Sequence, residues 1–299
     1  MDKIGIPRGL FYYYYKDIWV NFFDELNISY FISPNTNKEI MDRGIKVSAD
    51  EMCLSFKIFL GHVDYLKDKC NYLLVPRVSN YGSNNQTCTN FWAAYDVVNN
   101  LFDKKIIDYN IDLEHGETLK RGLYKIGKMF GKSNIEIKKA YYKDLYSYDL
   151  IRKKNIEINL NKLKSNRLKI LIVSHPYNTY DSMIGLEIVK YLNKNDVEII
   201  YSDKFDEMSS RLYKKISSDL YFKYNKDNVG AIVRSMSKID GIIFISSFPC
   251  GPDSLVNELV IRKIKIPNIN LIMDGNLSFE GIETRLESFL DVLRGNAYV

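Results

Sequence analysis

Short apolar segments alternate with longer stretches in which apolar residues recur every three or four positions. In the first part of the chain, segments rich in β-branched and aromatic residues predict four strands: KIGIP (3–7), SYFIS (29–33), NYLLVPR (71–77) and KIIDYNI (105–111). Between them, helical spacing predicts helices near residues 13–26, 52–66 and 88–102, and the polar segment 78–87 before the last of these helices predicts a loop.

The same plan returns from Leu168. LKILIVS, VEIIYS, IDGIIFISS and INLIM predict four more strands. Between them we predict a helix over 182–192, a helical stretch over 206–238 and a helix that begins after Cys250. Apolar, β-branched strands that alternate with helices are typical of parallel sheets covered by helices. We therefore predict an α/β protein with two flavodoxin-like or Rossmann-like domains.

Residues 116–165 break this alternation because they are helical in pattern and strongly charged. We interpret the segment as a helical connector whose individual charges face solvent. The predicted organisation is an N-terminal α/β domain at 1–112, a connector at 113–166 and a C-terminal α/β domain at 167–299.

Composition excludes several classes of protein. Of the 299 residues, 46% are hydrophobic and 26% are charged, which is typical of a globular protein, and no apolar run approaches the ~20 residues of a membrane span. The N-terminal segment lacks the features of a secretory signal, so we expect a cytoplasmic protein without a membrane partner. The net charge of +5 is dispersed, which argues against a nucleic-acid partner but suits an anionic ligand such as a nucleotide or coenzyme A.

Ligands of open parallel sheets bind beyond the carboxyl ends of the strands. Cys88 and Cys250 occupy corresponding places there, each in the loop between a third strand and its following helix, and Cys53 lies at another loop-to-helix position on this side. Cys70 directly precedes a strand at the opposite edge, so we predict a structural role for it.

Thiolates near helix N-termini are stabilised by the helix dipole, which favours metal ligation or nucleophilic chemistry. Iron–sulfur clusters and zinc both accept thiolate ligands, but this chain has no CxxC pair to distinguish them. Position alone leaves two interpretations open: a dispersed metal site, or four small buried cysteines.

Several segments follow one another in a familiar order: IGIPRGLFYYYYKDIWVNFFDELN, ADEMCLSFKIFLGH, the Cys88 loop, SHPYNTYDSMIG and FPCGPDSLVNELV. Together they resemble the acyl-CoA dehydratase activase-related family, the CoA-enzyme-activase-like proteins allied to 2-hydroxyacyl-CoA dehydratase subunits. The resemblance implies a [4Fe-4S] cluster held in the interdomain cleft by Cys53, Cys88 and Cys250, with one iron open to a ligand that is not cysteine.

Two differences from the allied proteins bear on activity. The chain is shorter than dehydratase subunits, and it has neither GxGxxG nor a Walker A loop, so we do not expect it to be the ATPase activator itself. The resemblance instead implies an ATP-dependent activase, or another low-potential electron donor, as partner. The resemblance is also compatible with an acyl-CoA or other small-molecule substrate. It is equally compatible with a homodimer.

Five further residues are candidates for the site. His175 could donate to the cluster, ligate the open iron or contact a substrate, or simply cap its loop. Glu51 and Asp253 flank the expected ligands and could move protons, or act only as first-turn acids. Arg8 could balance an anionic cluster or bind phosphate, with a structural ion pair as the alternative. Lys57, one helical turn after Cys53, could bias the cluster potential or be solvated.

Three hypotheses about function follow. The first is an iron–sulfur protein of anaerobic metabolism that serves low-potential electron transfer or reductive chemistry. The second is a 2-hydroxyacyl-CoA dehydratase-like lyase, which the short chain disfavours. The third is a two-domain module that binds a small ligand without metal.

Overall fold

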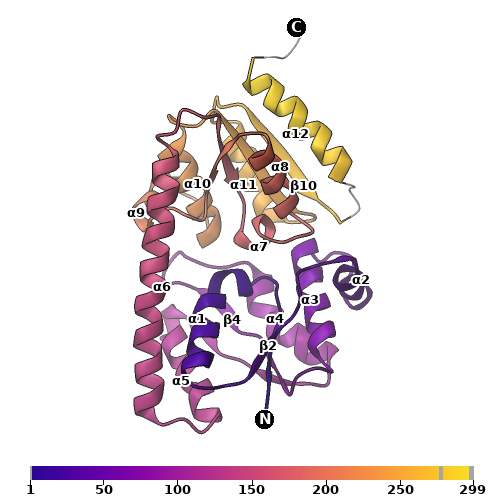
Figure 1. Ribbon diagram of the computed structural model, residues 1–299, viewed down its shortest axis with the longest axis vertical. Coiled ribbons are helices and arrows are strands. Elements are labelled where there is room, and N and C mark those ends of the chain that lie inside the picture. Colours follow the sequence, from indigo (N-terminus) through magenta and orange to yellow (C-terminus); the bar gives the residue numbers. More distant parts are fainter. Residues whose placement is uncertain (1, 276–278, 296–299) are drawn as a thin grey trace. The chain divides into compact units, whose positions relative to one another are not determined.

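The computed structural model describes residues 2–275 and 279–295. The chain forms two compact units, Met1–Arg152 (unit 1) and Lys153–Val299 (unit 2). The division falls inside one long helix, α6 (Asn134–Lys162), which runs without a break from one unit into the other (Figure 1). Each unit is described by itself.

Unit 1 is built on a four-stranded parallel sheet. Its strands are β1 (Ile4–Ile6), β2 (Tyr30–Ile32), β3 (Tyr72–Leu74) and β5 (Lys105–Ile107). Their order is β2-β1-β3-β5, and Ile4 is in register with both Tyr30 and Tyr72. Ile4 and Ile6 are fully buried, as expected for the central strand of a sheet covered on both faces.

A second, two-stranded sheet corrects the predicted boundaries. The predicted third and fourth strands are each divided, and their distal parts, β4 (Arg77–Asn80) and β6 (Asn110–Asp112), pair in parallel. Pro76 has no N–H to donate, so the ladder is interrupted there and resumes with the bond from Arg77 N to Tyr109 O. The segment predicted as a loop at 78–87 therefore begins as a strand.

Helices surround the first sheet. They are α1 (Tyr12–Glu25), α2 (Lys38–Val47), α3 (Leu54–Leu66), α4 (Thr89–Leu101), the 3₁₀ turn η1 (Leu113–His115) and α5 (Leu119–Met129). Helices α2 and α3 touch backbone to backbone, because a Cβ on Gly44 would lie only 1.9 Å from the carbonyl oxygen of Lys57. This close approach fixes the position of α3 against α2, and Cys53 immediately precedes the first turn of α3.

Unit 2 repeats the plan. Its strands are β7 (Lys169–Val173), β8 (Glu198–Tyr201), β9 (Gly241–Ser247) and β10 (Asn268–Met273). All pair in parallel in the order β10-β9-β7-β8, so in both units the first strand lies between the second and the third. That order is flavodoxin-like, and the predicted α/β class with parallel sheets is confirmed.

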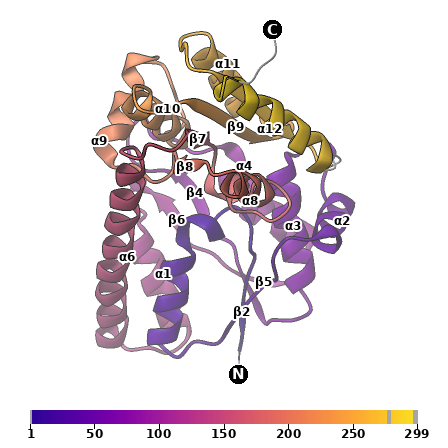
Figure 2. The same cartoon turned by 45° about the horizontal axis from the view of Figure 1, so that its top comes forward.

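Two layers of helices accompany the second sheet. The elements are α7 (Pro176–Thr179), α8 (Leu186–Lys194), α9 (Glu207–Ser210), η2 (Arg211–Lys215), α10 (Lys223–Ser235), α11 (Gly251–Ile261) and α12 (Phe279–Leu293). Helix α12 packs with α8, and α10 packs with α11 (Figure 2). The helix predicted from residue 182 begins at Leu186, and the stretch predicted as helical over 206–238 is interrupted between η2 and α10.

The segment predicted as a connector, 113–166, contains η1, α5 and α6. Helix α5 packs on β6 of unit 1, where a Cβ on Gly122 would lie 2.5 Å from the Tyr109 ring. Across residues 2–275 and 279–295, none of the helices combines the length and the hydropathy that a membrane crossing would require.

Candidate functional site

Three of the four cysteines share one local structure. Cys53, Cys88 and Cys250 are the N-cap residues of α3, α4 and α11, with extended backbone and half-exposed side chains. None of the three side chains caps its own helix through a hydrogen bond. Each cysteine therefore lies at the positive end of a helix dipole, a position that favours a thiolate. At Cys250 the hydrogen bond from its thiol to the Asp253 carboxylate opposes this effect.

Within unit 1, packing brings the first turns of α3 and α4 together. The ring of Phe11 contacts Phe59 of α3 at 5.8 Å and Phe91 of α4 at 4.9 Å between centroids. The amide Nδ2 of Asn90, in the first turn of α4, donates to Sγ of Cys53 at 3.6 Å. The turn that follows Cys88 thus contacts Cys53. Sequence reasoning missed Asn90, whose only signal was its position two residues after Cys88.

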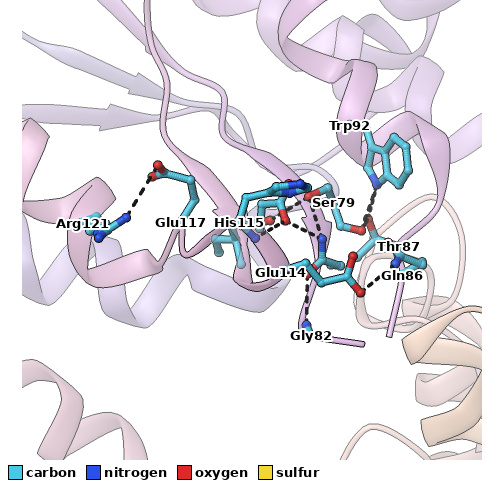
Figure 3. Close-up of polar contacts among 12 residues, drawn as sticks. Ser79, Gly82, Gln86, Thr87, Trp92, Glu114, His115, Glu117 and Arg121 are labelled. Atoms are coloured by element: carbon cyan, nitrogen blue, oxygen red, sulfur yellow. Dashed lines mark hydrogen bonds and ion pairs between the residues drawn. The ribbon is translucent and has the colours of Figure 1, made fainter. Parts of the chain in front are cut away.

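The loop that leads to Cys88 is held to β6 and η1 by a polar network (Figure 3). Asn80, which is 3% exposed, donates Nδ2 to Oδ1 of Asp112 at 2.7 Å. Its side-chain oxygen Oδ1 accepts from the backbone N–H groups of Gly82 and Glu114. His115 contacts the other oxygen of Asp112 at 2.9 Å. Burial would raise the pKa of the Asp112 carboxyl, but the bonds from Asn80 and His115 outweigh it and lower the pKa.

The end of this loop is fixed from α4. The indole Nε1 of Trp92 donates to the carbonyl of Ser79 at 3.0 Å and to Oγ1 of Thr87 at 3.1 Å (Figure 3). Thr87 in turn donates to the carbonyl of Val78. Because Thr87 immediately precedes Cys88, these bonds set the direction in which the chain enters α4.

In unit 2, the loops after β7 and β9 meet through a buried polar cluster. Nε2 of His175, the N-cap of α7, lies 3.0 Å from Oδ1 of Asp253 in the first turn of α11. Asn225 of α10 donates Nδ2 to the same oxygen at 3.0 Å. His175, Asp253 and Asn225 are each at most 6% exposed. The structure thus brings two of the predicted site residues, His175 and Asp253, together and adds Asn225, which no sequence pattern indicated.

The electrostatics of Asp253 follow from this cluster. Burial alone would raise the pKa of its carboxyl, but His175, Asn225 and the thiol of Cys250 hold the pKa below its usual value. The imidazole of His175 stacks on Tyr177 at 4.9 Å, with an interplanar angle of 7°. Asp253 is therefore a carboxylate that links Cys250 to His175.

Cys70 differs from the other three cysteines in every respect. Its side chain is 8% exposed, and Sγ donates to the carbonyl of Leu66 at 3.1 Å. Burial raises the pKa of the thiol, an effect that Lys104 and Lys3 only partly offset. A Cβ on Gly5 would lie 2.4 Å from this sulfur, so Cys70 fills space beside β1.

Arg8 lies directly after β1 and is held by neutral groups. It donates Nε to the carbonyl of Ser33 at 3.0 Å and a terminal nitrogen to Oδ1 of Asn35 at 2.8 Å, and it lies over the ring of Tyr12. No carboxylate pairs with it among residues 2–275 and 279–295. Burial, together with the charge of Arg8, lowers the pKa of His62 to about 3, which keeps this core histidine neutral.

The remaining two candidates, Lys57 and Glu51, lie within four residues of Cys53 in the sequence. Nζ of Lys57 donates to the carbonyl of Asp50 at 3.0 Å, so the lysine closes the loop before Cys53. Glu51 is exposed in that loop.

The three N-cap cysteines are divided between the units: Cys53 and Cys88 belong to unit 1 and Cys250 belongs to unit 2. In the part of the chain that the structure describes, no three His, Cys, Asp or Glu side chains are grouped as metal ligands.

Comparison with known proteins gives one family. The model of the family described as "CoA enzyme activase uncharacterised domain (DUF2229)" matches residues 3–205, which include Cys53, Cys88 and His175 but not Cys250 or Asp253. A comparison with curated proteins finds no match.

Likeness to solved structures is weak. The crystal structure of ZnuA is 8% identical, with 99% of each chain covered and a TM-score of 0.32. A sugar transporter from Clostridium phytofermentans is 12% identical, with 100% of this chain and 94% of that chain covered and a TM-score of 0.22. At these TM-scores neither likeness carries an argument.

Proposed function

The chain belongs to the CoA enzyme activase uncharacterised domain family, and we propose that it is a [4Fe-4S] protein of anaerobic metabolism. Its role would be low-potential electron transfer or reductive chemistry, supplied with electrons by an ATP-dependent activase or another low-potential donor. The proposed ligands are Cys53, Cys88 and Cys250. When bound, the cluster supplies one-electron reduction.

The observation that supports this proposal is the division among the cysteines. Three cysteines are half-exposed N-cap residues, whereas Cys70 is buried and bonded to Leu66. Iron–sulfur clusters are held by cysteine thiolates, so the ligating cysteines must be accessible and able to lose their protons. The donor set therefore fits the group chemically.

Neighbouring residues have chemistry that would support such ligands. Asn90 donates to the sulfur of Cys53, and hydrogen bonds to cluster sulfurs set reduction potentials. Arg8, which belongs to the same unit as Cys53 and Cys88, has no carboxylate partner among residues 2–275 and 279–295, and such a cation would offset part of the negative charge of a cluster bound close to it. His175 and Asp253 form a buried pair next to Cys250 that can hold a proton at a defined place.

The test is anaerobic purification followed by iron, sulfide and zinc analysis with electron paramagnetic resonance of the reduced protein. We expect one [4Fe-4S] cluster per chain, brown colour and bleaching in air. Stoichiometric zinc, or the absence of metal after anaerobic reconstitution with iron and sulfide, would refute the proposal.

A further inference from the structure

A cavity of about 510 Å³ lies in unit 2, and none of the described residues that line it is a cysteine. It is lined by the carboxyl-terminal part of α6, by the N-cap of α9 and by the end of α10, and Figure 2 shows these three helices beside one another. Its volume is within the range of small-molecule sites, roughly 300–1,000 Å³. All of its lining residues belong to unit 2.

The floor of the cavity is aliphatic. Leu163 is 7% exposed and belongs to the core of unit 2, Leu160 packs against that core, and Ile156 is half-exposed one turn before Leu160. No aromatic side chain lines the cavity among the described residues, so nothing there could stack on a nucleotide base. The floor therefore suits a flexible aliphatic body.

The rim is basic. Lys153, Lys164, Arg234 and Lys238 line the cavity together with Glu157 and Asp206. Oδ1 of Asp206 accepts two bonds from Ser209 at 2.7 Å each, so this carboxylate is occupied in capping α9. Four basic and two acidic groups leave a net charge of +2. The carboxyl ends of α6 and α10 offset about half a charge each, and the rim remains positive.

Three of these cations lack the ion pairs that neighbouring basic residues make. In unit 2, Lys162 pairs with Glu198 and Lys169 with Asp240. Over residues 153–275 and 279–295, no carboxylate lies within ion-pair distance of Lys153, Arg234 or Lys238.

We propose that this cavity binds a small amphiphilic anion, with an aliphatic body on the Ile156–Leu163 floor and a single carboxylate or phosphate group at the basic rim. The apolar floor alone would accept any hydrocarbon, and the basic rim alone would accept any anion. Their combination in one cavity selects a ligand that has both parts. This proposal does not depend on an iron–sulfur cluster.

The test is methyl-labelled NMR titration of the full-length protein with octanoate and with octyl phosphate, with 1-octanol and inorganic phosphate as comparisons. We expect saturable shifts at the Ile156, Leu160 and Leu163 methyls with one or both octyl anions, and the preferred head group identifies the ligand as a carboxylate or a phosphate. Because the cations of the rim are exposed, their ion pairs with the head group should contribute only modestly, and octanol should bind up to roughly 5-fold more weakly than the octyl anions. Octanol binding as tight as that of both anions, or no shift at the floor methyls, would overturn the proposal.

Variants separate the two parts of the site. The double variant R234Q/K238Q should weaken octyl-anion binding several-fold, whereas K194Q, which removes an exposed lysine from α8, should leave it unchanged. I156D should abolish binding by making the floor polar and negative. Circular dichroism melting of each variant verifies folding, and equal affinity of R234Q/K238Q and K194Q would also overturn the proposal.

Discussion

Nε2 of His175 lies 3.0 Å from Oδ1 of Asp253, and both side chains are almost completely buried. The contact joins the loop after β7 to the first turn of α11, immediately after Cys250. In a flavodoxin-like strand order these two loops lie at the topological switch point, where ligands bind. The pair therefore determines the surroundings of one of the proposed thiolate ligands.

Substitution of His175 by alanine should destabilise unit 2 even without metal. It leaves the buried Asp253 carboxylate with Asn225 and Cys250 as its remaining partners, and removing one member of a buried pair costs about 3–5 kcal/mol. Native-state hydrogen exchange of β9 and α11 in the metal-free protein measures the loss. His115→Ala is the matched control, because His115 is 77% exposed and its pairing with Asp112 should contribute less than about 1 kcal/mol. Equal losses for the two variants would show that the buried pair does not support unit 2.

The four cysteines should differ in their effect on metal content. Cys53→Ala, Cys88→Ala and Cys250→Ala are each expected to lose or destabilise the cluster, whereas Cys70→Ala retains it, because only Cys70 is buried and bonded to Leu66. Iron and sulfide per chain after anaerobic reconstitution measure this. If Cys70→Ala loses iron as the other variants do, the ligand assignment is wrong.

The difference between the buried Cys70 and the three half-exposed N-cap cysteines also predicts how fast each thiol reacts in the metal-free protein. Burial restricts access to Cys70 and raises its pKa, so iodoacetamide should modify it at least roughly tenfold more slowly than the three N-cap cysteines. Mass spectrometry of timed samples at pH 8 gives the four rates. Protein unfolded in urea is the control, and there the rates should converge. A fast Cys70 in the folded protein would contradict its structural role.

Asn90 is expected to tune the Cys53 ligand. Asn90→Ala removes the donor that lies 3.6 Å from Sγ, and loss of such an outer contact typically weakens metal binding about 10- to 100-fold. Without this hydrogen bond the reduced cluster is less stabilised, so the midpoint potential should fall. Redox titration and chelator competition measure the two effects. Asn100→Ala, later in the same helix, is the control, since its amide bonds only to the carbonyl of Asp96. Identical potentials for both variants would exclude a contact between Asn90 and the ligand.

The sequence could predict the α/β class and the exceptional position of Cys70, because both depend on local patterns of hydrophobicity and on strand ends. It could not predict the division of the third strand at Pro76 into two ladders, because the pairing partner is about thirty residues away. Asn225 and Asn90 were missed for a related reason. Asn90 of α4 reaches Cys53 before α3, and Asn225 of α10 reaches Asp253 of α11, so each contact joins two different helices. In the sequence, a lone asparagine in an amphipathic stretch is indistinguishable from a solvent-exposed one.

Asp144 is a buried acid that neither the sequence nor the proposed function explains. It lies on α6 at 2% exposure, and neither carboxylate oxygen receives a hydrogen bond of normal geometry from the described residues. Burial, with the nearby charges of Asp17 and Glu25, raises its pKa to about 7, although the neighbouring amide of Asn21 offsets part of the rise. The acid therefore stays protonated in the folded protein at pH values where the unfolded chain has already released its proton.

Because the pKa of Asp144 differs between the folded and the unfolded chain, the free energy of unfolding depends on pH, and the sign of this dependence can be predicted. As the pH rises from about 4 to about 7, the unfolded chain binds fewer protons than the folded one, so the free energy of unfolding falls and then levels off above pH 7. Asp144→Asn should abolish this loss of stability, with a gain of up to about 4 kcal/mol at pH 8 and almost none at pH 4. Urea unfolding followed by the fluorescence of Trp19 and Trp92, both in unit 1 with Asp144, measures it. Asp149→Asn, an exposed position on the same helix, is the control and should show no such dependence. A gain from Asp144→Asn that is the same at pH 4 and pH 8 would mean that another group titrates.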